Sequence, residues 1–151
     1  MIYGIGTDIV ELERVSRACR REAFLTRSFT EEELRQADRR TGMLAGDFSV
    51  KEAVAKAFGT GVTGFRLREI ECLRDERGAP YVRLSGAALE LRRRLGIGRI
   101  HVSISDCRNY VTAFAVAECA ETAGDREASG CPNNSERPEE TDAARTEKGK
   151  K

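Results

Sequence analysis

The sequence predicts an α+β fold, a compact single domain in which a largely antiparallel sheet packs against helices. The chain has 151 residues, enough for one domain with a core of its own. Apolar runs that read as strands occur in neighbouring pairs joined by short turns, which is typical of antiparallel hairpins. Segments of helical period separate these pairs, so the order differs from the alternation of strands and helices in doubly wound nucleotide-binding folds.

The first predicted elements are a strand over residues 2–9 and a helix over residues 11–22. The strand is an apolar run that the glycines of Gly4-Ile5-Gly6 interrupt. Another helix begins after Thr30, because Thr30 and Glu33 have the spacing of a capping box, in which each side chain binds the backbone N–H of the other residue.

The next predicted helix spans residues 49–58 and ends at a glycine. Ser49 and Glu52 again have capping-box spacing, and Gly59 stands where many helices end in a left-handed residue. Small and apolar residues lie on several sides of this helix, which predicts that it is well buried. They are Val50, Ala53, Val54, Ala57 and Phe58.

The rest of the folded part reads as two hairpins with a helix between them. The predicted segments are strands over residues 67–73 and 81–84, a helix from Ser85 to Leu95, and strands over residues 100–105 and 110–116. The turn Asp75-Glu76-Arg77-Gly78 joins the first pair of strands, and residues 106–109 join the second pair. Gly96 ends the helix.

The last part of the chain has a different composition. From Cys119 onward it contains no Ile, Leu, Val, Met, Phe, Tyr or Trp. Such a segment buries too little apolar surface to offset the entropy of ordering it. We therefore expect a folded domain over residues 1–118 and a disordered polar tail over residues 119–151.

Composition argues against several classes of protein. The formal net charge of +1 gives no indication of nucleic acid as a partner. No apolar run approaches the ~20 residues of a membrane helix, and the N-terminus lacks the pattern of a signal peptide. The five cysteines are scattered without Cys-x-x-Cys spacing, so we expect reduced thiols in the cytoplasm rather than a zinc site or a disulfide framework.

Three charged residues are candidates for chemistry. Asp8 follows the first strand and by itself suits a helix N-cap better than a metal site. Glu52 and Lys56 lie four residues apart on one helix face, a spacing that usually marks a solvated ion pair. The helix around them is apolar, however, and a charge on a buried helix needs a partner. Mg²⁺ is commonly bound by one or two carboxylates together with water and substrate phosphate. Asp8 and Glu52 could supply the two carboxylates of such a site.

Two further candidates are weaker. The cluster Gly59-Thr60-Gly61 has glycines like a phosphate-binding loop but lacks the lysine and hydroxyl residue of a P-loop, and a helix end explains Gly59 without any ligand. His101 is the only histidine, and a single histidine on an amphipathic strand is more often structural than catalytic. Ser103 and Asp106 follow it along one short strand and form no convincing catalytic triad.

The first helix carries an arginine strip, defined as Arg14, Arg17 and Arg21. With ~3.6 residues per turn these arginines point to one side of the helix, away from the apolar residues Leu12 and Val15. The pattern fits an ordinary solvated face and equally a docking surface for an acidic protein, since arginine suits carboxylate recognition.

Three stretches of this sequence, taken together, resemble the bacterial holo-[acyl-carrier-protein] synthases, the small type of 4′-phosphopantetheinyl transferase. They are residues 1–14, which contain Gly-Ile-Gly-Thr-Asp-Ile-Val-Glu, residues 48–61 and residues 101–106. The second stretch, Phe-Ser-Val-Lys-Glu-Ala-Val-Ala-Lys-Ala-Phe-Gly-Thr-Gly, is long and specific. The resemblance covers residues 1–118, with the stretches in the order found in the family.

The resemblance implies a reaction and the residues that perform it. Members of the family move 4′-phosphopantetheine from coenzyme A to a serine of an apo acyl carrier protein and release adenosine 3′,5′-bisphosphate, a step used in fatty acid biosynthesis. By analogy Asp8 and Glu52 hold Mg²⁺ and Lys56 contacts phosphate, with Lys51 as a weaker second candidate. The serine proton passes either to Glu52 or to water, and the sequence leaves both open.

The resemblance also implies binding surfaces. The turn Gly59-Thr60-Gly61 and His101 match family positions near coenzyme A. The arginine strip is expected to dock the acidic helix of the carrier protein. The family forms homotrimers with active sites between subunits. Asp47 is a departure, because some relatives carry arginine there, and a contact with coenzyme A phosphate is missing here if that arginine makes one.

Two other functions stay open from the sequence. A non-catalytic interaction domain would use the arginine strip alone, although the joint presence of Asp8, Glu52 and Lys56 argues against it. A different coenzyme A enzyme, such as a thioesterase, would need a nucleophile or an activated water at a thioester, and no such arrangement is evident. The sequence identifies neither the carrier protein nor the choice between Mg²⁺ and Mn²⁺.

Overall fold

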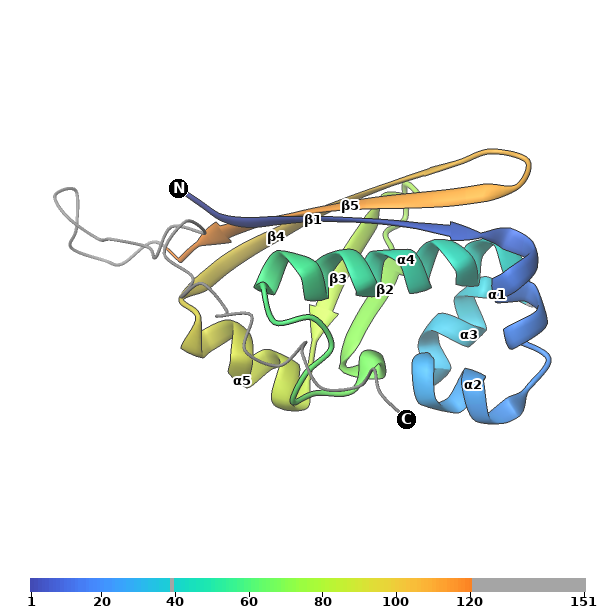
Figure 1. Ribbon diagram of the computed structural model, residues 1–151, viewed down its shortest axis with the longest axis horizontal. Coiled ribbons are helices and arrows are strands. Elements are labelled where there is room, and N and C mark those ends of the chain that lie inside the picture. The colour runs from blue at the N-terminus through green and yellow to red at the C-terminus, as the bar shows by residue number, and fades with distance from the viewer. Residues whose placement is uncertain (39, 121–151) are drawn as a thin grey trace, which may run out of the picture.

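The computed structural model describes residues 1–38 and 40–120 and confirms the α+β fold. Most of the predicted polar tail, residues 121–151, lies outside the described residues. Three long strands form one antiparallel sheet in the order β1-β5-β4 (Figure 1). They are β1 (Ile2–Glu11), β4 (Ile97–Asp106) and β5 (Tyr110–Cys119).

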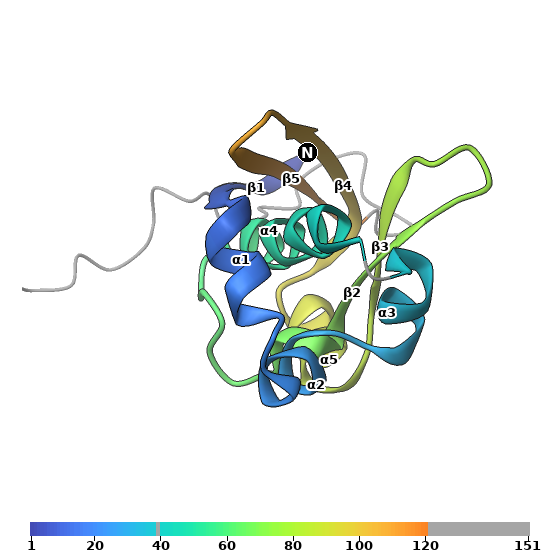
Figure 2. The same ribbon diagram turned by 90° about the vertical axis from the view of Figure 1, so that its right-hand side faces the viewer.

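A separate hairpin consists of β2 (Ile70–Arg74) and β3 (Pro80–Leu84). Figure 2 shows this hairpin leaning away from the three-stranded sheet. Its turn has Gly78 in the left-handed region, at φ 82°, with the Gly78 N–H donating to the carbonyl of Asp75 at 2.9 Å. The predicted turn and both predicted hairpins are confirmed, but the strand predicted from residue 67 begins only at Ile70, because residues 67–69 form a short 3₁₀ helix.

The helices lie on one face of the three-stranded sheet, and in the described part of the chain no helix covers the other face (Figure 1). The longest, α4 (Thr41–Phe58), runs along the sheet. The others are α1 (Leu12–Ala18), α2 (Glu22–Ser28), α3 (Glu31–Ala37), α5 (Gly86–Arg94) and the short 3₁₀ helix η1 (Leu67–Glu69). Among residues 1–38 and 40–120, no helix has the length and apolar character needed to span a membrane.

The start of α4 differs from the prediction. The helix begins at Thr41 rather than at residue 49. Its first half was not predicted, because Gly42 and Gly46 have low helix propensity. Ser49 is thus inside the helix, and the capping box predicted for it is wrong. Gly59 does end the helix in the left-handed region, at φ 81°. At α3 the predicted capping box of Thr30 and its partner glutamate is confirmed.

The contact between β1 and α4 is made by backbone atoms. A Cβ added at Gly6 would lie 2.0 Å from the carbonyl oxygen of Ala53, and one at Gly4 would lie 2.3 Å from that of Ala57. No side chain other than hydrogen fits at either position. The glycines that interrupt the first strand therefore allow α4 to lie directly against it, with buried alanines of β5 beside them.

Replacing Gly6 with alanine is expected to lower the free energy of unfolding by about 2 kcal/mol or more, because the added Cβ forces β1 away from α4. Gly42→Ala is a matched control, since no atom lies within 4 Å of a Cβ at that position and alanine favours a helix by up to about 1 kcal/mol. Urea unfolding measures both variants. Equal stabilities would contradict the close contact.

Candidate active site

Asp8 lies on the inner face of β1, toward α4. Its side chain is 14% exposed, and Oδ1 is 2.8 Å from Nζ of Lys56. The same ammonium group donates to the carbonyl of Thr7 at 2.9 Å. The strand continues beyond Asp8, and the residue that precedes α1 is Glu11. The N-cap role considered for Asp8 is therefore wrong, and its carboxylate is available for a site.

Two hydroxyl groups hold the backbone at Asp8. Its carbonyl oxygen accepts a hydrogen bond from the Thr112 hydroxyl of β5 at 2.8 Å and another from the Ser49 hydroxyl of α4 at 3.2 Å. The position of Asp8 is thus tied to both elements that pack beside β1. Ser49, which sequence reasoning treated as a helix cap, contributes to this arrangement through its side chain.

Glu52 lies one turn before Lys56 on α4 and is partly buried. Burial raises the pKa of the Glu52 carboxyl, the negative charge of Asp8 raises it further, and the positive charge of Lys56 opposes both effects. Glu52 is therefore within electrostatic reach of both other groups. The structure brings Asp8, Glu52 and Lys56 together where β1 meets α4.

The two carboxylates fit a hard divalent cation. Oδ2 of Asp8 is buried and has no hydrogen-bond partner among the described residues. The negative charges of Asp8 and Glu52 repel each other, and a cation between them would relieve that repulsion. Within residues 1–38 and 40–120 no third histidine, cysteine or carboxylate joins them. Water and phosphate oxygens would complete the shell, which is how Mg²⁺ is usually bound.

Lys51, the weaker candidate for phosphate contact, is not part of this group. Its ammonium group is fully buried and donates to Oε2 of Glu33 at 2.8 Å and to the carbonyl of Ile70 at 2.6 Å. Oε1 of Glu33 in turn accepts from the Cys72 N–H at 2.8 Å. Burial lowers the pKa of Lys51, and the charge of Glu33 opposes that change. Lys51 connects α4 to α3 and β2 inside the core.

The turn after α4 has the backbone freedom of a ligand-binding loop. Gly59 and Gly61 are both in the left-handed region, at φ 81° and 59°, and the Thr60 hydroxyl donates to the Gly61 carbonyl at 3.1 Å. The C-terminal end of a helix presents carbonyl groups rather than N–H groups. A phosphate here would therefore depend on the amides of the turn and on nearby Lys56. Its part in coenzyme binding stays a prediction.

His101 lies on the outer face of β4. Its Nε2 is 3.2 Å from Oε2 of Glu118 on β5, and both side chains are about half exposed. Strand β5 separates β4 from β1, and Asp8 is on the opposite face of the sheet. Within one chain the structure does not bring His101 to Asp8.

The arginine strip is interrupted. After Ala18 the N–H of Cys19 still binds a carbonyl four residues back, but the N–H groups of Arg20 and Arg21 bind carbonyls three residues back, which tightens the chain and ends α1. The single helix predicted over residues 11–22 is therefore wrong. Arg14 and Arg17 are exposed on α1, whereas Arg21 is in the extended link that precedes α2. None of the three forms an ion pair with another described residue.

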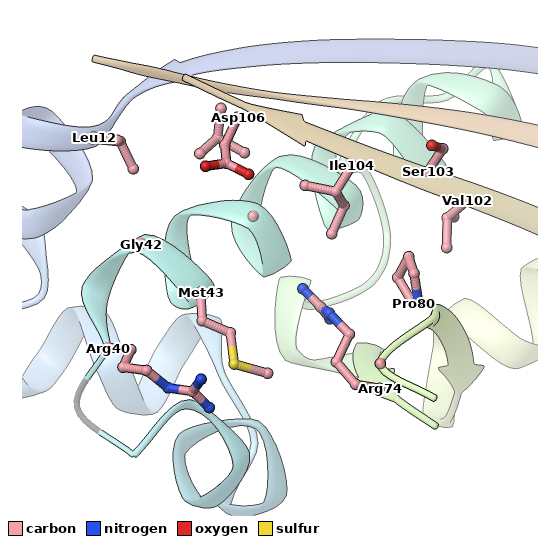
Figure 3. A pocket seen from close by; sticks show the side chains of 13 residues that line it. Leu12, Arg40, Gly42, Met43, Arg74, Pro80, Val102, Ser103, Ile104 and Asp106 are labelled. Atoms are coloured by element: carbon pink, nitrogen blue, oxygen red, sulfur yellow. The ribbon is translucent and has the colours of Figure 1, made fainter. Parts of the chain in front are cut away.

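A cavity of about 560 Å³ lies between the first half of α4, the β2–β3 hairpin and β4 (Figure 3). Its lining includes Arg40, Met43, Gly46, Arg74, Pro80 and Ile104. Asp8, Glu52 and Lys56 are not part of this lining. Sequence reasoning missed the cavity, because its walls come from segments far apart in the chain. Only Leu12 and the lining residues of β4 belong to stretches that carry the family resemblance.

The chain is similar to known proteins over most of its length. Residues 4–115 match a family model described as the 4′-phosphopantetheinyl transferase superfamily. A holo-[acyl-carrier-protein] synthase from Lachnoclostridium phytofermentans is 46% identical over 118 residues, which are 78% of this chain and 97% of the relative.

Solved structures agree with this comparison. The fold is similar to a holo-[acyl-carrier-protein] synthase from Neisseria meningitidis, with a TM-score of 0.72, 43% identity, and coverage of 78% of this chain and 99% of the other. It is also similar to one from Bacillus anthracis in complex with CoA (3′,5′-ADP), with a TM-score of 0.67, 34% identity, and coverage of 80% and 99%. The chain belongs to the holo-[acyl-carrier-protein] synthases of the 4′-phosphopantetheinyl transferase superfamily.

Proposed function

We propose that this chain transfers 4′-phosphopantetheine from coenzyme A to a serine hydroxyl of an apo acyl carrier protein. The observation that carries the proposal is the meeting of two carboxylates, Asp8 and Glu52, with the ammonium group of Lys56 where β1 touches α4. The related structure from Bacillus anthracis in complex with CoA (3′,5′-ADP) supports coenzyme A as the donor.

In this reaction the serine oxygen forms a bond to the phosphorus that carries pantetheine. The bond from that phosphorus to the bridging oxygen breaks, adenosine 3′,5′-bisphosphate leaves, and the hydroxyl proton is released. Lys56 stabilises the negative charge that develops on the phosphate oxygens, and its hydrogen bond to Asp8 holds the ammonium group in place. Mg²⁺ bound by Asp8 and Glu52 would supply polarisation of the pyrophosphate. The hydroxyls of Ser49 and Thr112 keep the backbone at Asp8 in place.

Incubation with coenzyme A and Mg²⁺ is expected to raise the mass of an apo acyl carrier protein by ~340 Da, the mass of a phosphopantetheine group. Glu52→Gln is expected to slow the transfer at least about 100-fold, because one of the two charged oxygen ligands is lost. Glu90→Gln is the matched control, since Glu90 is exposed and pairs only with Arg93 among the described residues. Intact-mass spectrometry follows the reaction.

A chelator is expected to abolish the mass gain in the same assay. A folded protein that binds Mg²⁺ yet modifies none of several carrier proteins would overturn the proposal and favour the interaction-domain alternative. Release of free thiol in place of adenosine 3′,5′-bisphosphate would instead indicate a thioesterase.

We also infer that Arg14 and Arg17 dock the acidic carrier protein, because both are exposed and lack an acidic partner in the described part of the chain. Arg17→Glu is expected to raise the KM for the carrier about tenfold with little change in kcat, and added salt should reduce the difference. Arg94→Glu, an exposed arginine on α5, serves as the control. The same KM in both variants would refute the docking role.

The outer face of the three-stranded sheet supports assembly of several copies. Of the eight exposed large hydrophobic residues among those described, five lie on β1 and β5. Ile5, Ile9, Tyr110 and Phe114 share the outer face by strand register. Contiguous apolar surface of this kind commonly marks an interface. The active site between subunits that the resemblance implies stays a prediction, since Asp8 lies on the opposite face of the sheet.

Sedimentation of the wild-type protein is expected to give three times the chain mass of 16.7 kDa. Phe114→Glu should dissociate the assembly, because it places a charge in the apolar face. Tyr81→Glu provides a comparison, since Tyr81 is an equally exposed aromatic residue on β3. A wild-type monomer, or dissociation by Tyr81→Glu alone, would rule out this interface.

A further inference from the structure

The ammonium group of Lys56 and a divalent cation would share one carboxylate. Nζ of Lys56 lies 2.8 Å from Oδ1 of Asp8, while the other oxygen, Oδ2, is buried and has no hydrogen-bond partner among the described residues. Mg²⁺ binds carboxylate oxygens at about 2.1 Å. A cation on Oδ2 would therefore lie within a few ångström of the ammonium group, and two positive charges at such a separation repel each other.

Two acceptors hold the ammonium group beside Asp8. It donates to Oδ1 of Asp8 at 2.8 Å and to the carbonyl of Thr7 at 2.9 Å. A lysine ammonium has three donors, and within residues 1–38 and 40–120 no acceptor takes the third one. The Lys56 side chain is 49% exposed, so the third donor is accessible to a ligand that enters the site.

The charge of Lys56 acts on Glu52 as well. Burial and the negative charge of Asp8 raise the pKa of the Glu52 carboxyl, and the positive charge of Lys56 opposes that rise. Lys56 thus supplies part of the positive charge that these two carboxylates would otherwise take from a metal ion. Lys51, the other lysine of α4, has no such effect on the site, since its ammonium group is enclosed in the core with Glu33.

We propose that Lys56 lowers the affinity of Asp8 and Glu52 for Mg²⁺ until a phosphate of coenzyme A binds the third donor of its ammonium group. The inference rests on the proposed function, which brings the pyrophosphate of coenzyme A to this site. The negative charge of a phosphate offsets the repulsion between the two cations. The affinities for Mg²⁺ and for coenzyme A are therefore coupled through Lys56, by the same factor in both directions.

This role differs from that of a lysine that only contacts phosphate. Removing a lysine of that kind would leave the affinity for Mg²⁺ unchanged when coenzyme A is absent. Competition at Asp8 has the opposite consequence, because loss of the ammonium group then strengthens the binding of Mg²⁺. The direction of the change in Mg²⁺ affinity therefore separates the two roles.

Calorimetric titration of Mg²⁺ into the full-length protein, with and without saturating coenzyme A and without carrier protein, tests the inference. In the absence of coenzyme A, Lys56→Gln is expected to bind Mg²⁺ about tenfold more tightly than the wild type, because the repulsion is lost. The gain in Mg²⁺ affinity on adding coenzyme A should be about tenfold smaller in Lys56→Gln than in the wild type. Lys56→Arg, which keeps the positive charge, should bind Mg²⁺ as weakly as the wild type.

Arg94→Gln is the matched control, since it removes an exposed positive charge from α5 and should leave the affinity for Mg²⁺ unchanged. Circular dichroism checks that each variant is folded, and Lys56→Met repeats the comparison if Lys56→Gln is not. Equal or weaker binding of Mg²⁺ by the folded variant without coenzyme A would overturn the inference and leave the transfer reaction standing. Wild-type protein that binds neither Mg²⁺ nor coenzyme A and modifies no carrier protein would instead refute the proposed function.

Discussion

The structure depends on the contact between β1 and α4. Because Gly4 and Gly6 have no side chains, the carbonyl groups of Ala53 and Ala57 approach the backbone of the strand directly. Only at this separation do the hydroxyl of Ser49 and the ammonium group of Lys56 reach Asp8. The contact between β1 and α4 that closes the core therefore also positions Asp8 relative to Lys56. No loop is needed to bring these two side chains together.

The helix α4 carries charges on several sides, and each is handled differently. Lys51 is enclosed and fully paired, so its charge is part of the internal support of α3 and β2. Lys56, a little over one turn later, is about half exposed and faces Asp8. Asp47 is enclosed with Arg74 on the side of the cavity. The direction in which each charged side chain leaves the α4 axis thus decides whether it supports the core, as Lys51 does, or faces the candidate site, as Lys56 does.

Local signals were the predictable part of this fold. The capping box at Thr30 and the turn at Gly78 are confirmed because each depends on residues that are neighbours in sequence. The first half of α4 escaped prediction because tertiary packing stabilises a stretch whose glycines disfavour a helix. The end of α1 after Ala18 was not predictable, because no proline or glycine follows that residue.

The candidate site was predictable in part for the same reason. Glu52 and Lys56 share a helix face by spacing alone, but the approach of Asp8 depends on a strand from the other end of the fold. The burial of Lys51 depends on Glu33, and the cavity around Arg74 depends on segments that only the tertiary structure brings together. No local pattern contains that information.

Strand β1 serves two surfaces through the alternation of its side chains. Asp8 faces α4, while Ile5, Thr7 and Ile9 face outward on the bare side of the sheet. A deletion or insertion of one residue ahead of Asp8 would turn an isoleucine toward the helix and the carboxylate toward the apolar face. Only insertions or deletions of two residues in this strand therefore keep Asp8 facing α4. The same alternation of side chains determines both the carboxylate of the site and the apolar outer face.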